Sequence, residues 1–164
     1  MFGIDASTLF VSLIFVIAIS SPFVYYSLKS KKNYKINLEI FRNFSKTIGA
    51  NPTQIENWRN QYFLGYDPKA KIVVYLNSGL NPEQTFINLG EVKKISIQEK
   101  THLVESGVEK RNVLDYLGIQ FNFKDHYKPE KLIEIYDSEL FTGQDGEVVL
   151  AKNWVELLNN QLNN

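Results

Sequence analysis

Two histidines, together with scattered carboxylates such as three of the aspartates, are residues of this chain that could support catalysis or bind a metal. His102 and His126 are the two histidines, and His126 directly follows Asp125. An Asp-His pair can contribute metal ligands, but neither histidine stands in an HExxH motif or at another metal-binding spacing. We therefore interpret both histidines as surface residues. Asp115, Asp125 and Asp137 are scattered carboxylates that an enzyme would have to use as acid–base groups.

Common sequence signatures of catalysis are missing from the chain. It has no cysteine, which excludes a thiol nucleophile, a zinc thiolate site and a disulfide, and which suits a reducing compartment. It contains no GxSxG, GxGxxG or GxxxxGKS/T segment. Residues 143–147, GQDGE, faintly resemble a calcium loop but lack its alternating oxygen ligands, so a helix cap explains them better. We expect no cofactor and no metal.

Two groups of lysines are candidates for contacts with anionic groups. The first group follows an apolar N-terminal segment and consists of Lys29, Lys31, Lys32 and Lys35. These lysines could touch lipid head groups, although a role in membrane topology alone is the simpler interpretation. Weaker candidates for a ligand surface are Lys69, Lys71, Lys93 and Lys94. A solvated strand edge explains the last two equally well. The formal net charge is zero, so nucleic acid is not an expected partner.

An uncharged segment at residues 6–28 would position these lysines at a membrane. Residues 9–28 read LFVSLIFVIAISSPFVYYSL, and about 20 such residues form a helix that crosses the hydrocarbon core of a bilayer. Lysines follow the segment and only Asp5 precedes it, so the positive-inside rule predicts a cytoplasmic C-terminal domain. A cleaved signal peptide is the alternative, but its basic residues would precede the apolar run. We expect a retained single-pass anchor at residues 1–34.

The rest of the chain alternates between helical and strand patterns. Residues 35–58 are predicted to be a linker, with an amphipathic helix at 35–48 before Gly49 and a short helical turn from Pro52 to Trp58. Strands are predicted at residues 62–66, 72–76, 85–89, 92–100, 117–123 and 132–137; residues 101–104 either extend one strand or start another, and 105–112 are a polar loop. A final amphipathic helix is predicted from the apolar stripe of Val148, Ala151, Val155, Leu158 and Leu162.

The order of these elements resembles the pleckstrin-homology-like (PH-like) fold, in particular bacterial membrane-anchored proteins with a PH-like domain. The resemblance covers residues 62–162 and lies in the segments YFLGYDPKAKIVVYL, INLGEVKKISI, LGIQFNFKD with LIEIYD, and AKNWVELLNNQL. The expected fold is α+β: an N-terminal transmembrane helix, then at residues 59–164 a small antiparallel β-barrel or sheet of about seven strands with a C-terminal capping helix. Phosphoinositide-binding PH domains resemble one another in a basic cluster in the first hairpin loop. The corresponding loop of this chain has Lys69 and Lys71 but no arginine, so a phosphoinositide is not the expected ligand.

A non-enzymatic binding or scaffold module is the function that the resemblance implies, because this fold is generally not an enzyme. A membrane anchor raises the effective concentration of such a module at the bilayer, so even a weak binding surface can act. No motif identifies its protein or lipid partner. The alternative is a small membrane enzyme, or an accessory subunit of a membrane enzyme complex, with Asp115, Asp125 and Asp137 as its candidate carboxylates.

Overall fold

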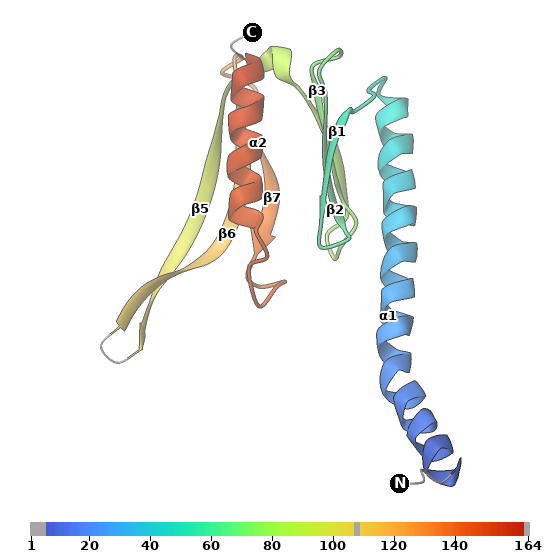
Figure 1. Cartoon of the computed structure of the whole chain (residues 1–164). Helices are drawn as coiled ribbons and strands as arrows, with labels where there is room; N and C mark the ends of the chain where they lie inside the picture. Colours follow the sequence, from blue (N-terminus) through green and yellow to red (C-terminus); the bar gives the residue numbers. More distant parts are fainter. Residues whose placement is uncertain (1–5, 107–108, 163–164) are drawn as a thin grey trace.

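One long helix begins the structure, a computed structural model that describes residues 6–106 and 109–162. α1 (Ala6–Thr47) has 42 residues and no glycine, so it continues without a break from the apolar segment into the polar one. Pro22 lies inside the helix and lacks the N–H that would bond the preceding turn. The ribbon bends in this N-terminal part (Figure 1). Gly49, with φ 72°, provides the predicted stop, so the helix predicted at residues 35–48 is the C-terminal part of α1.

α1 is long and apolar enough to cross a membrane. No residue of its apolar 18-residue window is buried inside the structure, and all of residues 9–28 are exposed. A signal sequence meets the same criteria of length and composition. The confirmed part of the prediction is therefore an apolar N-terminal helix with the dimensions of a membrane span.

Four antiparallel strands form the first sheet, in the order β1-β2-β3-β4. They are β1 (Gln54–Trp58), β2 (Tyr62–Asp67), β3 (Ile72–Asn77) and β4 (Glu83–Asn88). The predicted hairpin of β2 and β3 is confirmed. Its turn is closed by Asp67, whose Oδ1 accepts hydrogen bonds from the backbone N–H groups of Lys69 at 2.8 Å and Ala70 at 3.1 Å. This is the local pattern that Asp favours at the start of a turn.

β1 replaces the helical turn that the sequence predicts up to Trp58, and that prediction is wrong. Its residues pair antiparallel with β2 along their whole length. Arg59 and Asn60 follow with positive φ values of 53° and 56°, as a type I′ hairpin turn requires. A single helical turn fixes many dihedral angles for very few hydrogen bonds, whereas β1 gains a full ladder with β2. The hairpin is therefore the more stable arrangement.

Three antiparallel strands form the second sheet, in the order β5-β6-β7. They are β5 (Val92–Ser106), β6 (Glu109–Phe123) and β7 (Lys131–Asp137), and the short 3-10 helix η1 (Leu89–Glu91) leads into them from β4. β5 and β6 pair as far as Ser106 and Glu109, where the sequence predicts a polar loop at 105–112. Residues 107 and 108 lie outside the described residues. β7 pairs with β6 only up to Tyr116. Beyond that residue, β5 and β6 form a two-stranded ribbon, which lacks the alternating apolar face that marks a strand in a sequence.

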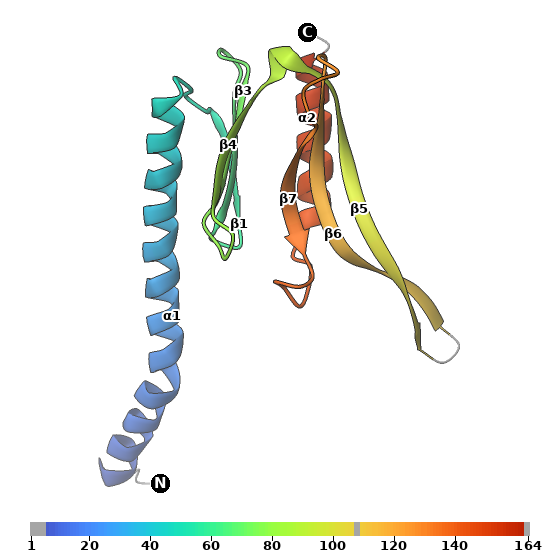
Figure 2. The same ribbon diagram turned by 180° about the vertical axis from the view of Figure 1, so that it is seen from behind.

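α2 (Glu147–Leu162) is the predicted C-terminal helix, and it covers the second sheet (Figures 1 and 2). Its buried apolar residues are Ala151, Trp154 and Leu158. Together with the inner faces of both sheets they form the main core. The seven strands lie in two sheets, and the described strands do not close into the barrel that was one of the two expected forms. The confirmed fold is therefore α+β with two antiparallel sheets.

The C-terminal part of α1 packs against the outer face of the first sheet, beside which Figure 1 shows it. Phe41 is fully buried there, and its ring stacks on Phe63 with 5.7 Å between the ring centroids. The other buried members of this second cluster are Ala50, Val74 and Leu76. A Cβ atom added to Gly65 of β2 would lie 2.7 Å from Cζ of Phe41. The first sheet is therefore covered on both faces, by α1 on one side and by the main core on the other.

Candidate functional site

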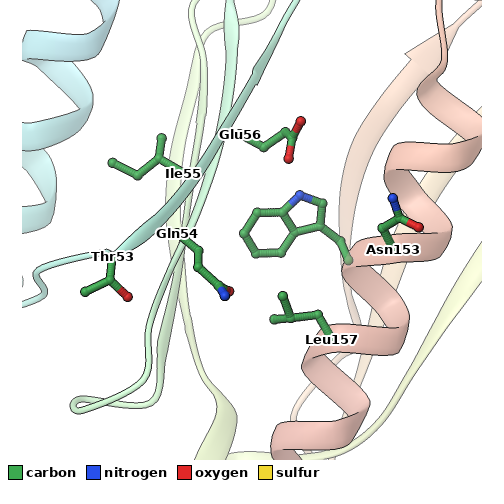
Figure 3. Close-up of a pocket in the computed structure, with 7 residues that line it drawn as sticks. Thr53, Gln54, Ile55, Glu56, Asn153 and Leu157 are labelled. Atoms are coloured by element: carbon green, nitrogen blue, oxygen red, sulfur yellow. The ribbon is translucent and has the colours of Figure 1, made fainter.

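A groove of about 420 Å³ lies between β1 and α2, and Figure 3 shows the side chains around it. Its lining residues are Thr53, Gln54, Ile55, Glu56, Asn153, Trp154 and Leu157. Figure 3 places Glu56 and Leu157 toward opposite ends of the groove. Glu56 is the one ionisable residue of this set. The groove therefore combines apolar walls with amide groups and a single negative charge.

The backbone of β1 provides a polar wall of the groove. β1 is the outer strand of its sheet and pairs with β2 on one side. The N–H and C=O groups of an antiparallel strand point alternately to its two edges, so an outer strand leaves one row of them without a strand partner. In the part of the chain that the structure describes, no strand pairs with β1 on its second side. This site can therefore bind groups that both donate and accept hydrogen bonds.

Trp58 fixes the end of β1 to the second sheet. Its indole Nε1 donates a hydrogen bond to the backbone oxygen of Ile135 in β7, at 2.9 Å. Its ring also stacks on Tyr62, with 5.2 Å between the ring centroids. The side chain is buried, so the strand wall of the groove is held in place by core contacts.

An ion pair fixes the start of α2 relative to the turn that follows β1. Arg59 Nε donates a hydrogen bond to Glu147 Oε1 at 2.6 Å, and Arg59 Nη2 donates to the backbone oxygen of Gly143 at 2.5 Å. The guanidinium carbon lies 4.4 Å from the ring centroid of Phe141. Glu147 is only 1% exposed and also accepts a hydrogen bond from the backbone N–H of Asp145. The predicted helix start at these residues is confirmed, and the same carboxylate sets the distance between α2 and the β1–β2 hairpin.

Two tyrosines of the first sheet bind β7 across the core. The Tyr62 hydroxyl donates a hydrogen bond to Glu134 Oε1 at 2.8 Å, and the Tyr75 hydroxyl donates to the backbone oxygen of Glu134 at 3.0 Å. Burial, reinforced by the Glu134 carboxylate, raises the pKa of both phenols well above its ordinary value. Both hydroxyls therefore stay protonated and act as permanent donors between the sheets.

Tyr66 lies next to the groove with a hydroxyl that is buried and has no hydrogen-bond partner among the described residues. It stands opposite Gln54 in the pairing of β1 with β2, and residues opposite one another share a face of the sheet. Burial, with a smaller contribution from the Asp67 carboxylate, raises the pKa of Tyr66. A buried hydroxyl without a hydrogen-bond partner lowers the free energy of unfolding, so the Tyr66 hydroxyl destabilises the fold.

The lysines singled out in the sequence do not line the groove. The weaker candidates are all exposed: Lys69 and Lys71 in the β2–β3 turn, Lys93 and Lys94 at the start of β5. Figure 1 places that turn and that strand start at the end of the domain remote from the N-terminal part of α1. The other lysines are exposed on α1, directly after its apolar segment: Lys29, Lys31, Lys32 and Lys35.

The three candidate aspartates do not converge on one site, although two of them lie beside a histidine. Asp115 contacts His102 on the hairpin of β5 and β6, with 2.5 Å between Oδ1 and Nδ1. Asp125 and Asp137 each use Oδ1 to accept a hydrogen bond at 2.9 Å from the backbone N–H two residues later, which closes a turn. His126 is exposed in the loop after β6. Within residues 6–106 and 109–162, no group of three or more potential metal ligands occurs.

Sequence reasoning missed the groove because its two walls come from opposite ends of the domain, and because one wall is predicted as helix. The signal that could have revealed β1 is the alternation of polar Gln54, apolar Ile55 and polar Glu56. That alternation covers too few residues to outweigh the helix-start signal at Pro52.

Comparison with models of protein families, with curated proteins and with solved structures gave no match. The fold and the groove nevertheless define a class of molecule: an α+β protein with an N-terminal helix of membrane-spanning length and two antiparallel sheets under a C-terminal helix.

Proposed function

We propose that this chain is a non-enzymatic recognition module that α1 tethers to a membrane. The observation that carries the proposal is the continuity of α1, whose apolar part contains no buried residue and whose C-terminal part buries Phe41 against the first sheet. A helix of this kind serves both as a membrane span and as a layer of the domain. Tethering keeps the domain at the lipid surface, where a partner in the same membrane meets it at high effective concentration.

Contacts near the end of the apolar segment support a domain that stands directly on the membrane. Asn60 Nδ2 donates a hydrogen bond to Ser30 Oγ at 2.7 Å, and Asn37 Nδ2 donates to the backbone oxygen of Asn60 at 2.9 Å. Ser30 lies between Lys29 and Lys31. The β1–β2 turn therefore sits at the level of the basic residues, which in a spanning helix is the level of the lipid head groups.

The orientation we propose places the domain on the cytoplasmic face of a bacterial inner membrane. Support comes from the lysines that follow the apolar segment, all of them exposed, against a single acidic residue before it. We also propose that the domain belongs to the PH-like class. Its order of four strands, then three strands, then a C-terminal helix supports this, as does the packing of that helix against the core formed by both sheets.

Reporter fusions test the tether and its orientation. The full chain, expressed in a bacterium with green fluorescent protein at its C-terminus, should remain in the membrane pellet after alkaline carbonate extraction and should fluoresce. A matched fusion to a periplasm-dependent phosphatase should be inactive. Release of a shortened soluble product that lacks the apolar segment, or high phosphatase activity, would overturn the tether or the orientation respectively.

Photocrosslinking tests recognition itself. The photoreactive analogue p-benzoylphenylalanine would be placed singly at Ile55, Phe86 or Tyr127, which are 39%, 50% and 98% exposed and lie in β1, in β4 and in the β6–β7 loop. In intact membranes we expect a light-dependent adduct at one or more positions, and a weaker adduct when residues 1–28 are deleted and the expression level is matched. A chain that forms no adduct at any of these positions would contradict a recognition function.

A further inference from the structure

We infer that β1 is a docking strand to which an extended segment of a partner protein adds as a further strand, with its side chains in the groove beside α2. The segment carries a lysine or arginine and, two residues away, an apolar side chain. This inference rests on the proposed function and names the kind of partner that the domain recognises.

The two strand edges beside α2 are treated differently by the fold. On the β5 side, Asn159 of α2 covers the edge: its Nδ2 donates to the backbone oxygen of Ile95 at 3.0 Å, and its Oδ1 accepts from the N–H of Ile95 at 3.4 Å. A side-chain amide that occupies both backbone groups prevents another strand from pairing there. On the β1 side, no strand among the described residues pairs with the second edge. The β5 edge is thus covered by a side chain, whereas the β1 edge has no strand partner.

An extended polypeptide is the occupant that this open edge favours. The edge presents alternating N–H and C=O groups at the repeat of a strand, and only another extended backbone satisfies a row of both kinds. Apolar ligands would leave these groups unpaired at a cost in binding. The groove is lined beside this edge by Trp154 and Leu157, so a docked strand can bury side chains on α2 as well as form backbone hydrogen bonds.

The side-chain pattern of the segment follows from the faces of β1. Gln54 and Glu56 are two residues apart and share a face, whereas Ile55 lies on the opposite face and also lines a hollow beside Phe41 of α1. A basic side chain of the segment would pair with Glu56. The residue two positions along the segment shares that face and meets the other end of the groove, where Figure 3 places Leu157 beside the amide of Gln54. The charge of Glu56 at one end and the apolar side chain of Leu157 at the other fix the register.

A designed probe peptide tests this inference on the full chain in detergent micelles. The probe is a short fluorescein-labelled peptide of threonines that contains one lysine and, two residues later, one leucine; its partner probe has glutamate in place of lysine. Two further versions carry N-methyl groups on alternate residues, one version on each of the two alternating sets, because each set faces one edge of an extended chain. Binding is measured by fluorescence anisotropy for wild type, Glu56→Lys and the matched control Glu99→Lys, an exposed glutamate on β5.

The expected results have a signature that a general loss of folding would not produce. The lysine probe should bind wild type more tightly than the glutamate probe, Glu56→Lys should reverse this preference, and Glu99→Lys should leave it unchanged. N-methylation of one alternating set should weaken binding about tenfold or more, and methylation of the other set should have little effect. Absence of binding, an unchanged preference in Glu56→Lys, or equal effects of both methylated sets would overturn the docking strand. In the photocrosslinking experiment, adducts at Phe86 or Tyr127 but not at Ile55 would also contradict the docking strand, but they would still support the proposed function.

Discussion

Replacement of Gly65 by alanine tests whether α1 is a layer of the domain. A Cβ at this position of β2 would lie 2.7 Å from Cζ of Phe41, 3.0 Å from Cβ of Pro52 and 3.3 Å from the backbone oxygen of Gln54. In a strand with free space, alanine is more stable than glycine by about 0.5–1 kcal/mol. Overpacking against a fixed ring instead lowers the free energy of unfolding by about 1–3 kcal/mol. The sign of the change therefore reports whether the Phe41 ring is there.

A second substitution separates the ring contact from other effects. Phe41→Leu removes the ring atom that the new Cβ would meet, and alone it should lower the free energy of unfolding by about 1–2 kcal/mol. In the double variant the two losses should not add, because the leucine makes room for the alanine. We expect a favourable coupling of about 1 kcal/mol between the two positions.

Urea unfolding of the full chain in detergent micelles measures these changes. Trp58 and Trp154 are both buried and are the two tryptophans of the chain, so their fluorescence reports on the domain. Gly143→Ala is the matched control, since a Cβ there would meet no atom within 4 Å, and its effect should stay within about 0.5 kcal/mol. A Gly65→Ala variant as stable as wild type, or a double variant with additive losses, would refute the packing of α1 on the first sheet.

Other predictions concern polar groups of the domain. Tyr66→Phe should leave the free energy of unfolding unchanged or raise it by about 1 kcal/mol, since it removes an unpaired buried hydroxyl. Tyr62→Phe should lower it by about 1–2 kcal/mol, since that hydroxyl donates to a carboxylate. Arg59→Ala should lower it by about 3 kcal/mol, because Glu147 would keep a buried carboxylate without its charged partner. Hydrogen bonds from backbone N–H groups, that of Asn51 first, hold the pKa of Asp67 below its ordinary value. This aspartate therefore stabilises the fold above the unfolded-state pKa of about 4, and the contribution is lost as pH falls through the lower folded-state pKa. In Asp67→Asn, the free energy of unfolding should therefore fall less steeply as the pH is lowered.

The same unfolding assay, repeated between neutral and acidic pH, checks these predictions. Arg111→Ala, which removes an exposed arginine on the β5–β6 hairpin, is the control for Arg59→Ala and should change stability by less than about 0.5 kcal/mol. Equal losses for Tyr66→Phe and Tyr62→Phe would contradict the different partners of the two hydroxyls. A variant at Asp67 whose stability falls with acid as steeply as that of wild type would contradict the depressed pKa.

Elements with a clear apolar period were predictable from the sequence, and elements held by tertiary pairing were not. Residues 117–123 alternate strictly and lie inside β6, and the apolar stripe of α2 is buried as its spacing requires. β1 escaped prediction because its few residues gain stability from pairing with β2 rather than from their own pattern. The outer part of the β5–β6 ribbon, predicted as a polar loop at residues 105–112, escaped because its residues lack a strict alternation of apolar and polar side chains.

The candidate groove depends on three-dimensional neighbours that no local pattern records. Asn159 carries no sequence signal of a contact with β5, yet its amide covers the edge of that strand. Arg59 carries no sequence signal, yet it joins the β1–β2 turn to the first residue of α2 across a large separation in sequence. Local composition predicts which residues are apolar or charged, and long-range packing decides which of them meet.

The unbroken course of α1 between Leu28 and Phe41 leaves the domain without a hinge at its base. A membrane-spanning helix tilts by different amounts in membranes of different thickness. In the membrane-spanning arrangement that we propose, a change in tilt turns the first sheet by the same angle, because the sheet is packed on that helix and the β1–β2 turn is hydrogen-bonded to it at Ser30. The direction in which β1 faces across the membrane plane would then be set by the surrounding lipid.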